Sequence, residues 1–178
     1  FYNCPSLITL PTDFFKYNSI VSSFNRTFME CTGLTSLPSG LFNSTSITNF
    51  YLTFAYCYQL TTILDTLFNS CTNVNSFYQT FYQCMNLTTI PETLFSGLTL
   101  VTNLYQTFFY CTGLTSIPAN LFSGLTLINN LYGTFMYCSM LDGLAPELWI
   151  TYPSASHQYC FYNDTLLDNY VDIPADWK

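Results

Sequence analysis

The chain has 178 residues, of which 49% are hydrophobic, 19% aromatic and only 7% charged. This hydrophobic content excludes a disordered chain, and the length suffices for one domain with its own core. Ten acidic and three basic residues give a net charge of −7, so the clustered cations that nucleic-acid binding requires are missing. No run of about 18 apolar residues occurs, and no segment is predicted to span a membrane.

One pattern recurs from the first residue onward, with a period of 26 or 27 residues. Each copy has an aromatic residue, a cysteine three positions later and a leucine three positions after the cysteine. The cysteines of these copies are Cys4, Cys31, Cys57, Cys84, Cys111 and Cys138. One such unit cannot bury its apolar side alone, whereas stacked units share a continuous core, so the repeat predicts a solenoid.

The copy around residues 108–134 shows which elements to expect within each turn. Residues 114–117 have side chains that favour β-structure and predict a short strand. Pro118 ends this strand and is a suitable first residue for a helical turn. Gly124 permits a left-handed exit from that turn. In the preceding repeat, Val101, Leu104, Phe108 and Cys111 recur at helical spacing and predict a short helix. The expected fold is therefore an α/β solenoid of about six turns, each with a short strand and a helical turn or helix.

The run of residues 101–117 carries a family resemblance. Val101-Thr102-Asn103, Thr107-Phe108, Cys111 and Leu114-Thr115-Ser116-Ile117 resemble the BspA-like branch of the leucine-rich-repeat family, whose short repeats occur in bacterial and mycoplasmal surface lipoproteins. The resemblance covers residues 1–150 and implies a surface-exposed or extracellular module that binds other molecules. The additional aromatic residues and the near absence of charge depart from the family pattern and leave the ligand class open.

The pattern weakens after Leu144, and a degenerate copy begins at Phe161. We expect residues 1–150 to form the solenoid and residues 151–178 to form a degenerate repeat and an acidic C-terminal cap, because terminal repeats need a polar outer face. Four acids supply that polarity: Asp164, Asp168, Asp172 and Asp176. A solvated cap is favoured over a calcium site, since no glycine-containing calcium loop is present. The start at Phe1, already in phase with the repeat, predicts an N-terminal end that exposes apolar surface.

The cysteine row allows two interpretations. Stacked turns lie about 4.8 Å apart, which is within the range for disulfides. Identical positions on parallel turns point their side chains the same way, however, and cysteine suits a tight interior, so free buried thiols are favoured. No metal site is predicted, because His157 is the only histidine and no Cys-x-x-Cys motif occurs. No cofactor is expected either.

Two rows of side chains are candidate binding surfaces. The first lies on the predicted strand face and offers an uncharged groove for a protein or glycan ligand; its alternative explanation is the strand preference of threonine. Its members are Thr35, Ser36, Thr61, Thr62, Thr88, Thr89, Thr115 and Ser116. The second row lies on the predicted helix side and is either an interaction stripe or a packing ladder. Its members are Tyr51, Tyr78, Tyr105 and Tyr132.

Short sequence motifs indicate which modification and which chemistry the chain could support. Asn25, Asn43, Asn86 and Asn163 begin Asn-x-Ser/Thr sequences and would accept glycans in a glycosylating secretory host. No nucleophile, paired carboxylates or phosphate-binding loop forms a catalytic pattern, so no enzyme is predicted.

The sequence leaves two candidate functions for the protein. The first is an extracellular or surface-exposed, adhesin-like protein-interaction module. The alternative is a structural subunit of an extracellular filament or of a phage or virion appendage, which would self-associate through the open end at Phe1 and the tyrosine row.

Overall fold

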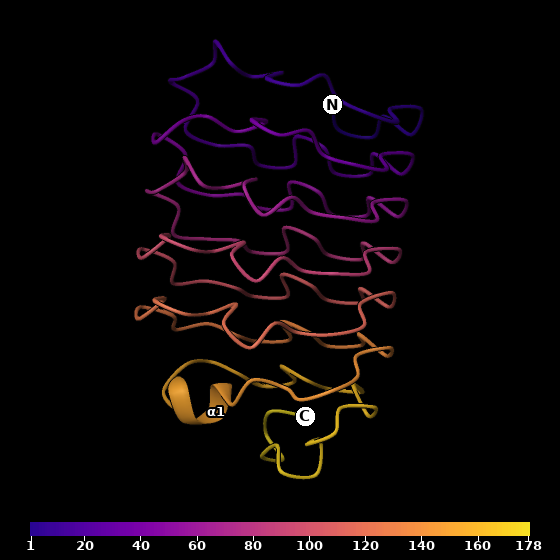
Figure 1. Cartoon of the computed structure of the whole chain (residues 1–178), viewed down its shortest axis with the longest axis vertical. Helices are drawn as coiled ribbons and strands as arrows, with labels where there is room; N and C mark the ends of the chain where they lie inside the picture. Colours follow the sequence, from indigo (N-terminus) through magenta and orange to yellow (C-terminus); the bar gives the residue numbers. More distant parts are fainter.

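A computed structural model describes all residues, 1–178, and shows a chain that winds into a stack of similar turns (Figure 1). The N-terminus lies in the turn at one end and the C-terminus at the other. Isolated parallel bridges join equivalent positions of consecutive turns, so each turn advances the stack by one repeat. The bridged pairs are Ser23–Asn49, Asn49–Ser76, Ser76–Asn103, Asn103–Asn130 and Asn130–Ser156, and Gly143–Leu167 is a further bridge near the C-terminal end that lies outside this register. The predicted solenoid is confirmed.

The predicted helix over residues 101–111 is wrong, because this segment forms consecutive β-turns. Thr107 N–H donates to Leu104 O at 3.2 Å within the turn, whereas Phe108 N–H donates to Thr134 O of the next turn at 2.9 Å. Gln106 has a φ of +49°, a left-handed conformation that costs a non-glycine residue about 1 kcal/mol. Its N–H donates to Tyr132 O at 2.9 Å. A helix would satisfy these donors internally and leave the stacked turns without bonds.

The predicted strand over residues 114–117 does not form either. Thr115 N–H donates to Thr88 O at 3.2 Å, and this single bond per turn is too sparse for a ladder. The only helix is α1, Leu148–Thr151, which lies near the C-terminal end (Figure 1). The fold is therefore a solenoid of turns and bridges rather than the expected α/β solenoid. None of its elements is a helix long and apolar enough to cross a membrane.

The core is a single column of aromatic and aliphatic side chains. Phe54, Phe81, Phe108 and Phe135 are fully buried, and neighbouring rings in this row stack with centroids 5.5–5.6 Å apart and interplanar angles of 4–9°. Rows of leucine and isoleucine run beside them in the same cluster. Stacked turns thus bury what no single turn could bury.

Polar groups within this core are paired across turns. All eight cysteines are free thiols, and seven of them are buried. The Cys111 thiol donates to Phe81 O at 3.1 Å, and the Cys84 thiol donates to Phe54 O at 3.2 Å. Burial raises the pKa of the Cys71 thiol to about 12, so these thiols stay protonated at neutral pH. The Thr107 hydroxyl, also buried, donates to Phe77 O at 2.9 Å.

The two ends of the stack differ. At the C-terminal end, Phe161 N–H donates to Trp177 O at 2.8 Å, and the His157 ring stacks on the buried Trp177 ring at 4.3 Å. At the other end Phe1, whose equivalents are fully buried, is 51% exposed. Asp164 corrects one expectation: it does not contribute to a solvated acidic surface but is fully buried.

Candidate functional site

The predicted hydroxyl face consists of two rows with different roles. In the first row each threonine hydroxyl donates to the carbonyl of its neighbour one turn earlier, as Thr88 does to Thr61 O and Thr115 to Thr88 O, both at 3.3 Å. Thr35 and Thr61 do the same. These hydroxyl protons therefore link neighbouring turns and are not available to donate to a ligand.

The second row is free. Its side chains are exposed and make no hydrogen bond within the protein, so they remain available to solvent or to a partner. Its members are Ser36, Thr62, Thr89 and Ser116. Half of the predicted hydroxyl set is thus a surface row, whereas the other half is structural.

The tyrosine row is continuous, as the sequence predicted, but it lies on β-turn segments rather than on helices. The rings of Tyr51, Tyr78, Tyr105 and Tyr132 stack at successive centroid distances of 4.9, 4.6 and 5.0 Å. The Arg26 guanidinium lies over the Tyr51 ring at 5.4 Å, at the N-terminal end of the row. Partial burial raises the pKa of Tyr78 and Tyr105, so these two phenols are neutral at physiological pH.

A row of Asn and Ser side chains fixes the tyrosine backbone, and sequence reasoning missed this role. Tyr105 N–H donates to Asn103 Oδ1 at 2.9 Å, and Tyr132 N–H donates to Asn130 Oδ1 at 3.1 Å. The interval of two residues is typical of side chains that mimic a backbone turn. The Asn-x-Tyr spacing in the repeat was the signal that could have revealed it.

A second aromatic row was also missed. Tyr82 stacks on Phe109 at 4.7 Å and 5°, and Phe109 meets Tyr137 edge to face at 5.7 Å. Between this row and the tyrosine row, the Gln79 amide donates to Gln106 Oε1 at 2.7 Å. Sequence reasoning could have found the row from the recurring aromatic residues that follow the core phenylalanines.

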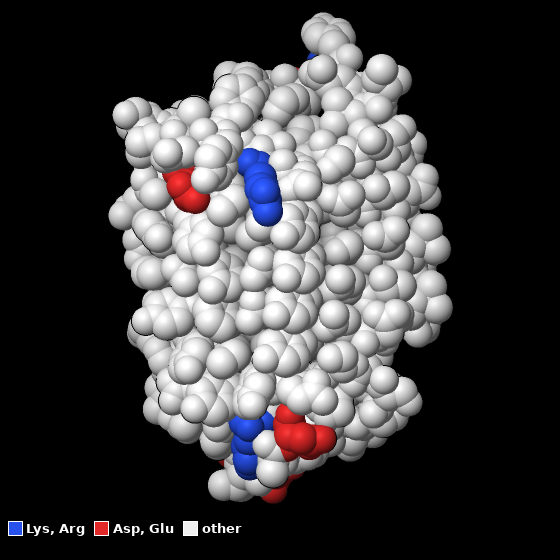
Figure 2. Space-filling model, turned by 180° about the vertical axis from the view of Figure 1, so that it is seen from behind, with Lys and Arg blue, Asp and Glu red and all other residues white.

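The rest of the surface carries little charge. Figure 2 shows one face on which coloured atoms gather near the two ends of the stack, with an uncharged middle. No group of three or more His, Cys, Asp or Glu residues is arranged to hold a metal ion. The four predicted glycan acceptors, Asn25, Asn43, Asn86 and Asn163, are all exposed.

Comparison with known proteins gives neighbours in structure alone. No family model matches the sequence, and no curated protein is found to be similar to it. A leucine-rich repeat protein from Bacteroides ovatus is 20% identical with a TM-score of 0.44, and the match covers 90% of this chain and 44% of that one. A leucine-rich repeat protein of T. pallidum is 19% identical with a TM-score of 0.36, over 71% of this chain and 64% of that one.

A third similar structure is the Drosophila Toll–Spatzle complex, which is 21% identical with a TM-score of 0.39. That match covers 78% of this chain and 25% of the other. The chain therefore spans less than two thirds of each of these three proteins. Because no family model matches, the BspA-like resemblance stays a prediction.

Proposed function

We propose that the protein is a protein-interaction module that acts at a cell surface or in the extracellular space. The observation that carries the proposal is the stacked tyrosine row. Its backbone is held by the Asn and Ser row, so the phenols are ordered before a partner arrives and binding costs little conformational entropy. Tyrosine is enriched at protein interfaces because its ring is apolar and its hydroxyl forms hydrogen bonds.

The geometry of the row favours a protein over a glycan. Rings 4.6–5.0 Å apart cover each other's faces, so the row presents ring edges and hydroxyls. A sugar ring stacks on a free aromatic face, which these tyrosines do not offer. Ring edges and hydroxyls suit apolar contact and hydrogen bonds with a protein surface.

The surface location is supported by the sequence resemblance to surface proteins. The exposure of Asn25, Asn43, Asn86 and Asn163 is compatible with glycosylation in a secretory host. The uncharged middle of the face in Figure 2 suits recognition through hydrogen bonds and apolar contact, with little electrostatic steering.

The test compares the two candidate faces against panels of purified extracellular proteins and glycans. For a protein that binds, we expect Tyr105→Ala to weaken the affinity about tenfold, as for an interface anchor, and Tyr105→Phe to weaken it less. Thr89→Val, on the free hydroxyl row, serves as the matched control and should leave the affinity unchanged. Binding of glycans alone, or loss of binding only in Thr89→Val, would contradict the proposal.

A structural role is the second candidate function, and a specific observation favours it. The N-terminal end exposes large apolar side chains, including Phe1 at 51%, Ile8 at 60% and Ile20 at 89%. Exposed apolar surface of this kind is a candidate site of association. Contact between two copies through this exposed surface would close as a dimer, and a filament would need an additional contact.

Sedimentation velocity over a range of concentrations, together with negative-stain microscopy, tests this second candidate. We expect dimers or longer assemblies that Ile8→Asp abolishes. Ile150→Asp replaces another exposed isoleucine, 64% exposed and near the opposite end, and should leave the assemblies intact. A monomer at every concentration would rule out the structural role.

A further inference from the structure

Residues 170–178, the covering segment, pack on the turn that residues 157–164 form. Trp177 lies at the centre of this contact, because its ring is buried and its carbonyl accepts from Phe161 N–H at 2.8 Å. Ile173, in the same segment, is also buried in the core. Two titratable groups of the covered turn, an imidazole and a carboxyl group, lie at this contact, so their protonation affects how firmly the segment is held.

The chain just before the covering segment is anchored elsewhere. The Asn169 side chain accepts from Ala145 N–H at 2.9 Å and donates to Ala145 O at 3.1 Å. The repeat changes course at this point: Leu144 occupies the register of buried isoleucines but is 69% exposed, and the smaller Ala145 takes the buried place. Neither bond of Asn169 involves a group that titrates, so this residue is a fixed point beyond which the segment can open.

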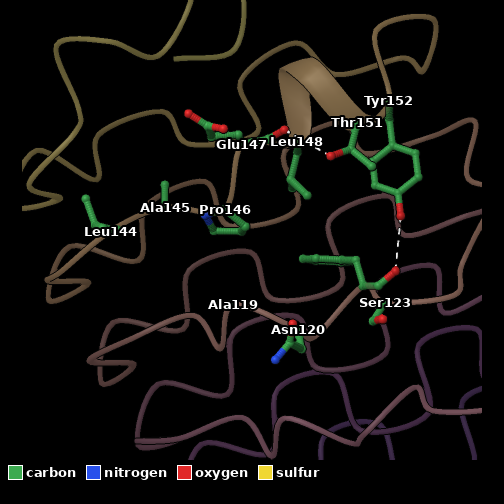
Figure 3. A pocket seen from close by; sticks show the side chains of 11 residues that line it. Ala119, Asn120, Ser123, Leu144, Ala145, Pro146, Glu147, Leu148, Thr151 and Tyr152 are labelled. Atoms are coloured by element: carbon green, nitrogen blue, oxygen red, sulfur yellow. Dashed lines mark hydrogen bonds between the residues drawn. The ribbon is translucent and has the colours of Figure 1, made fainter.

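The surroundings of this anchor are also insensitive to pH near neutrality. A cavity of about 500 Å³ lies beside Leu144, between α1 and the preceding turn (Figure 3). Across it the Tyr152 hydroxyl donates to Phe122 O at 3.1 Å and ties the end of α1 to that turn. Burial raises the pKa of the Tyr152 phenol, so this bond persists at neutral pH. Any sensitivity to pH must therefore come from the contact of the covering segment itself.

The His157 ring is the first titratable group of that contact, and both of its nitrogens face acceptors. Nδ1 lies 2.6 Å from Ala155 O, and Nε2 lies 2.8 Å from Asp176 Oδ2. The hydrogen bond from His157 lowers the pKa of Asp176, so this partner is an ionised carboxylate. A carbonyl and a carboxylate can only accept, so the two bonds require a proton on each nitrogen, which is the charged imidazolium. The ring also stacks on Trp177, with centroids 4.3 Å apart and planes at 2°, and a tryptophan face attracts a cation.

Asp164 is the second titratable group, and it is enclosed completely. Its side chain is fully buried, and neither carboxylate oxygen has a hydrogen-bond partner. The titratable groups near it are the thiols of Cys138 and Cys160 and the phenol of Tyr170, which belongs to the covering segment. The one cation of the segment does not pair with it, since Lys178 Nζ donates to Tyr170 O at 2.7 Å. Only the neutral, protonated acid suits this enclosure, because a buried charge without partners is costly.

We propose that the covering segment is a pH-sensitive switch, which lies closed over this turn in mild acid and opens locally as the pH rises through neutrality. Loss of the second His157 proton leaves two acceptors face to face, and loss of the Asp164 proton leaves an enclosed charge. Both penalties exist only in the closed form, so opening becomes easier as the pH rises. Histidine exchanges its proton between about pH 5 and pH 8, which places the change in the physiological range. In stronger acid Asp176 takes up a proton and its bond to His157 weakens, so the closed form is most stable in mild acid.

Opening of the segment leaves the stack folded, because in a solenoid each turn contacts only its neighbours. It uncovers the Trp177 ring, which is 3% exposed when closed, and frees the Phe161 N–H. The switch thus controls the exposure of apolar surface that is not part of the tyrosine row. The inference therefore goes beyond the proposed function and does not rest on it.

Amide hydrogen exchange at pH 5, 6, 7 and 8, corrected for intrinsic exchange rates, tests the switch. We expect the protection of Phe161 N–H to fall about tenfold over this range, the value of one hydrogen bond to a charged group. Urea below the unfolding transition should accelerate Phe161 exchange little, because local opening exposes little surface, whereas Phe108 N–H, in the middle of the stack, should respond strongly.

Two exposed aspartates of the segment supply a matched pair of variants. In Asp176→Asn the amide can donate to an unprotonated Nε2, so closure no longer needs the second His157 proton and Phe161 stays better protected at pH 8. Asp172→Asn removes an equal charge nearby and should behave like the unaltered protein. Asp164→Cys, combined with Asp176→Asn, should abolish the dependence on pH.

Three results would overturn the proposal. The first is protection of Phe161 N–H that stays constant from pH 5 to pH 8. The second is equal behaviour of Asp176→Asn and Asp172→Asn, which are both surface changes and leave the core intact. The third is exchange of Phe161 as sensitive to dilute urea as that of Phe108, because the segment would then open only when the whole stack unfolds.

Discussion

Asp164 is the residue whose environment departs most from that of an ordinary acidic side chain. It lies in the register of the cysteine row, one turn after Cys138, and both of its carboxylate oxygens are buried without a hydrogen-bond partner. Burial raises its pKa well above the ordinary value of 3.8. The Cys138 thiol, by contrast, donates to Phe108 O at 3.0 Å and is fully satisfied in the equivalent place. The buried carboxyl group of Asp164 therefore destabilises the last turn.

Its titration should make folding pH-dependent. The folded state holds the proton more tightly than the unfolded state, so the free energy of unfolding falls as pH rises from about 3.8 to the raised pKa. Each pH unit inside that window removes up to about 1.4 kcal/mol. We expect Asp164→Cys, which completes the thiol row, to stabilise the protein at pH 7 and to flatten this slope. Urea unfolding at pH 5, 6, 7 and 8 measures both effects.

Asp168→Asn is the control, because Asp168 is an exposed aspartate close by in the chain. It should retain the slope of the unaltered protein. If Asp164→Cys and the unaltered protein lose stability in parallel between pH 5 and pH 8, the buried acid is not the group that titrates.

At the scale of the repeating element, a buried threonine links each turn to the one before. The Thr107 hydroxyl lies 2.9 Å from both Phe77 O and Leu104 O, and the Thr134 hydroxyl donates to Leu104 O at 3.0 Å. The single Thr107 proton is thus shared between a carbonyl of the preceding turn and one of its own turn. Thr107→Val keeps the shape of the side chain but removes this donor inside the core.

We expect Thr107→Val to lower the free energy of unfolding by about 1–3 kcal/mol, the cost of leaving buried acceptors without this partner. Thr102→Val is the matched control: its hydroxyl donates to Asn75 O at 3.2 Å, but the side chain is partly exposed and water can replace it. Urea unfolding at pH 7 compares the two. Equal decreases in the free energy of unfolding for the two variants would show that burial of the Thr107 hydroxyl does not determine the effect of its removal.

The sequence was sufficient to predict which side chains form the core but not how the backbone connects them. The pattern of Phe108, Cys111 and Leu114 recurs along the repeat, and these three residues are buried as predicted. Their spacing of three residues fits a helix and equally fits successive β-turns, and the inter-turn bonds that decide between the two do not appear in a single repeat. The donor roles of Cys111 and Thr107 were invisible for the same reason.

The candidate sites were predicted unevenly. The tyrosine row follows directly from the period, because residues one repeat apart lie above one another in any solenoid. The bonded hydroxyls of Thr88 and Thr115 depend on backbone geometry, which the residue type does not determine. The cavity beside Leu144 arises where the repeat is broken, so a periodic pattern predicts a buried leucine there instead.

At the scale of the whole molecule, the difference between the two ends should set a gradient of stability. In solenoids each turn contacts only its neighbours, so an uncovered terminal turn opens locally without unfolding the rest. The N-terminal turn is bonded on one side, for example through Asn3 N–H to Met29 O at 2.9 Å, and is open on the other. The C-terminal turn is covered by the segment that contains Trp177.

Amide hydrogen exchange measures this gradient directly. In the unaltered protein we expect Asn3 N–H to exchange faster than Phe161 N–H, which donates to Trp177 O, and the amides of Thr88 and Phe108 to be the slowest. Trp177→Ala removes a buried ring that stacks on His157 and should cost roughly 3–5 kcal/mol of local packing. Exchange should then accelerate over residues 157–178 while the central turns keep their protection. Uniform acceleration of all turns would show instead that the stack opens as one cooperative unit, and the unequal ends would then have no influence on where unfolding begins.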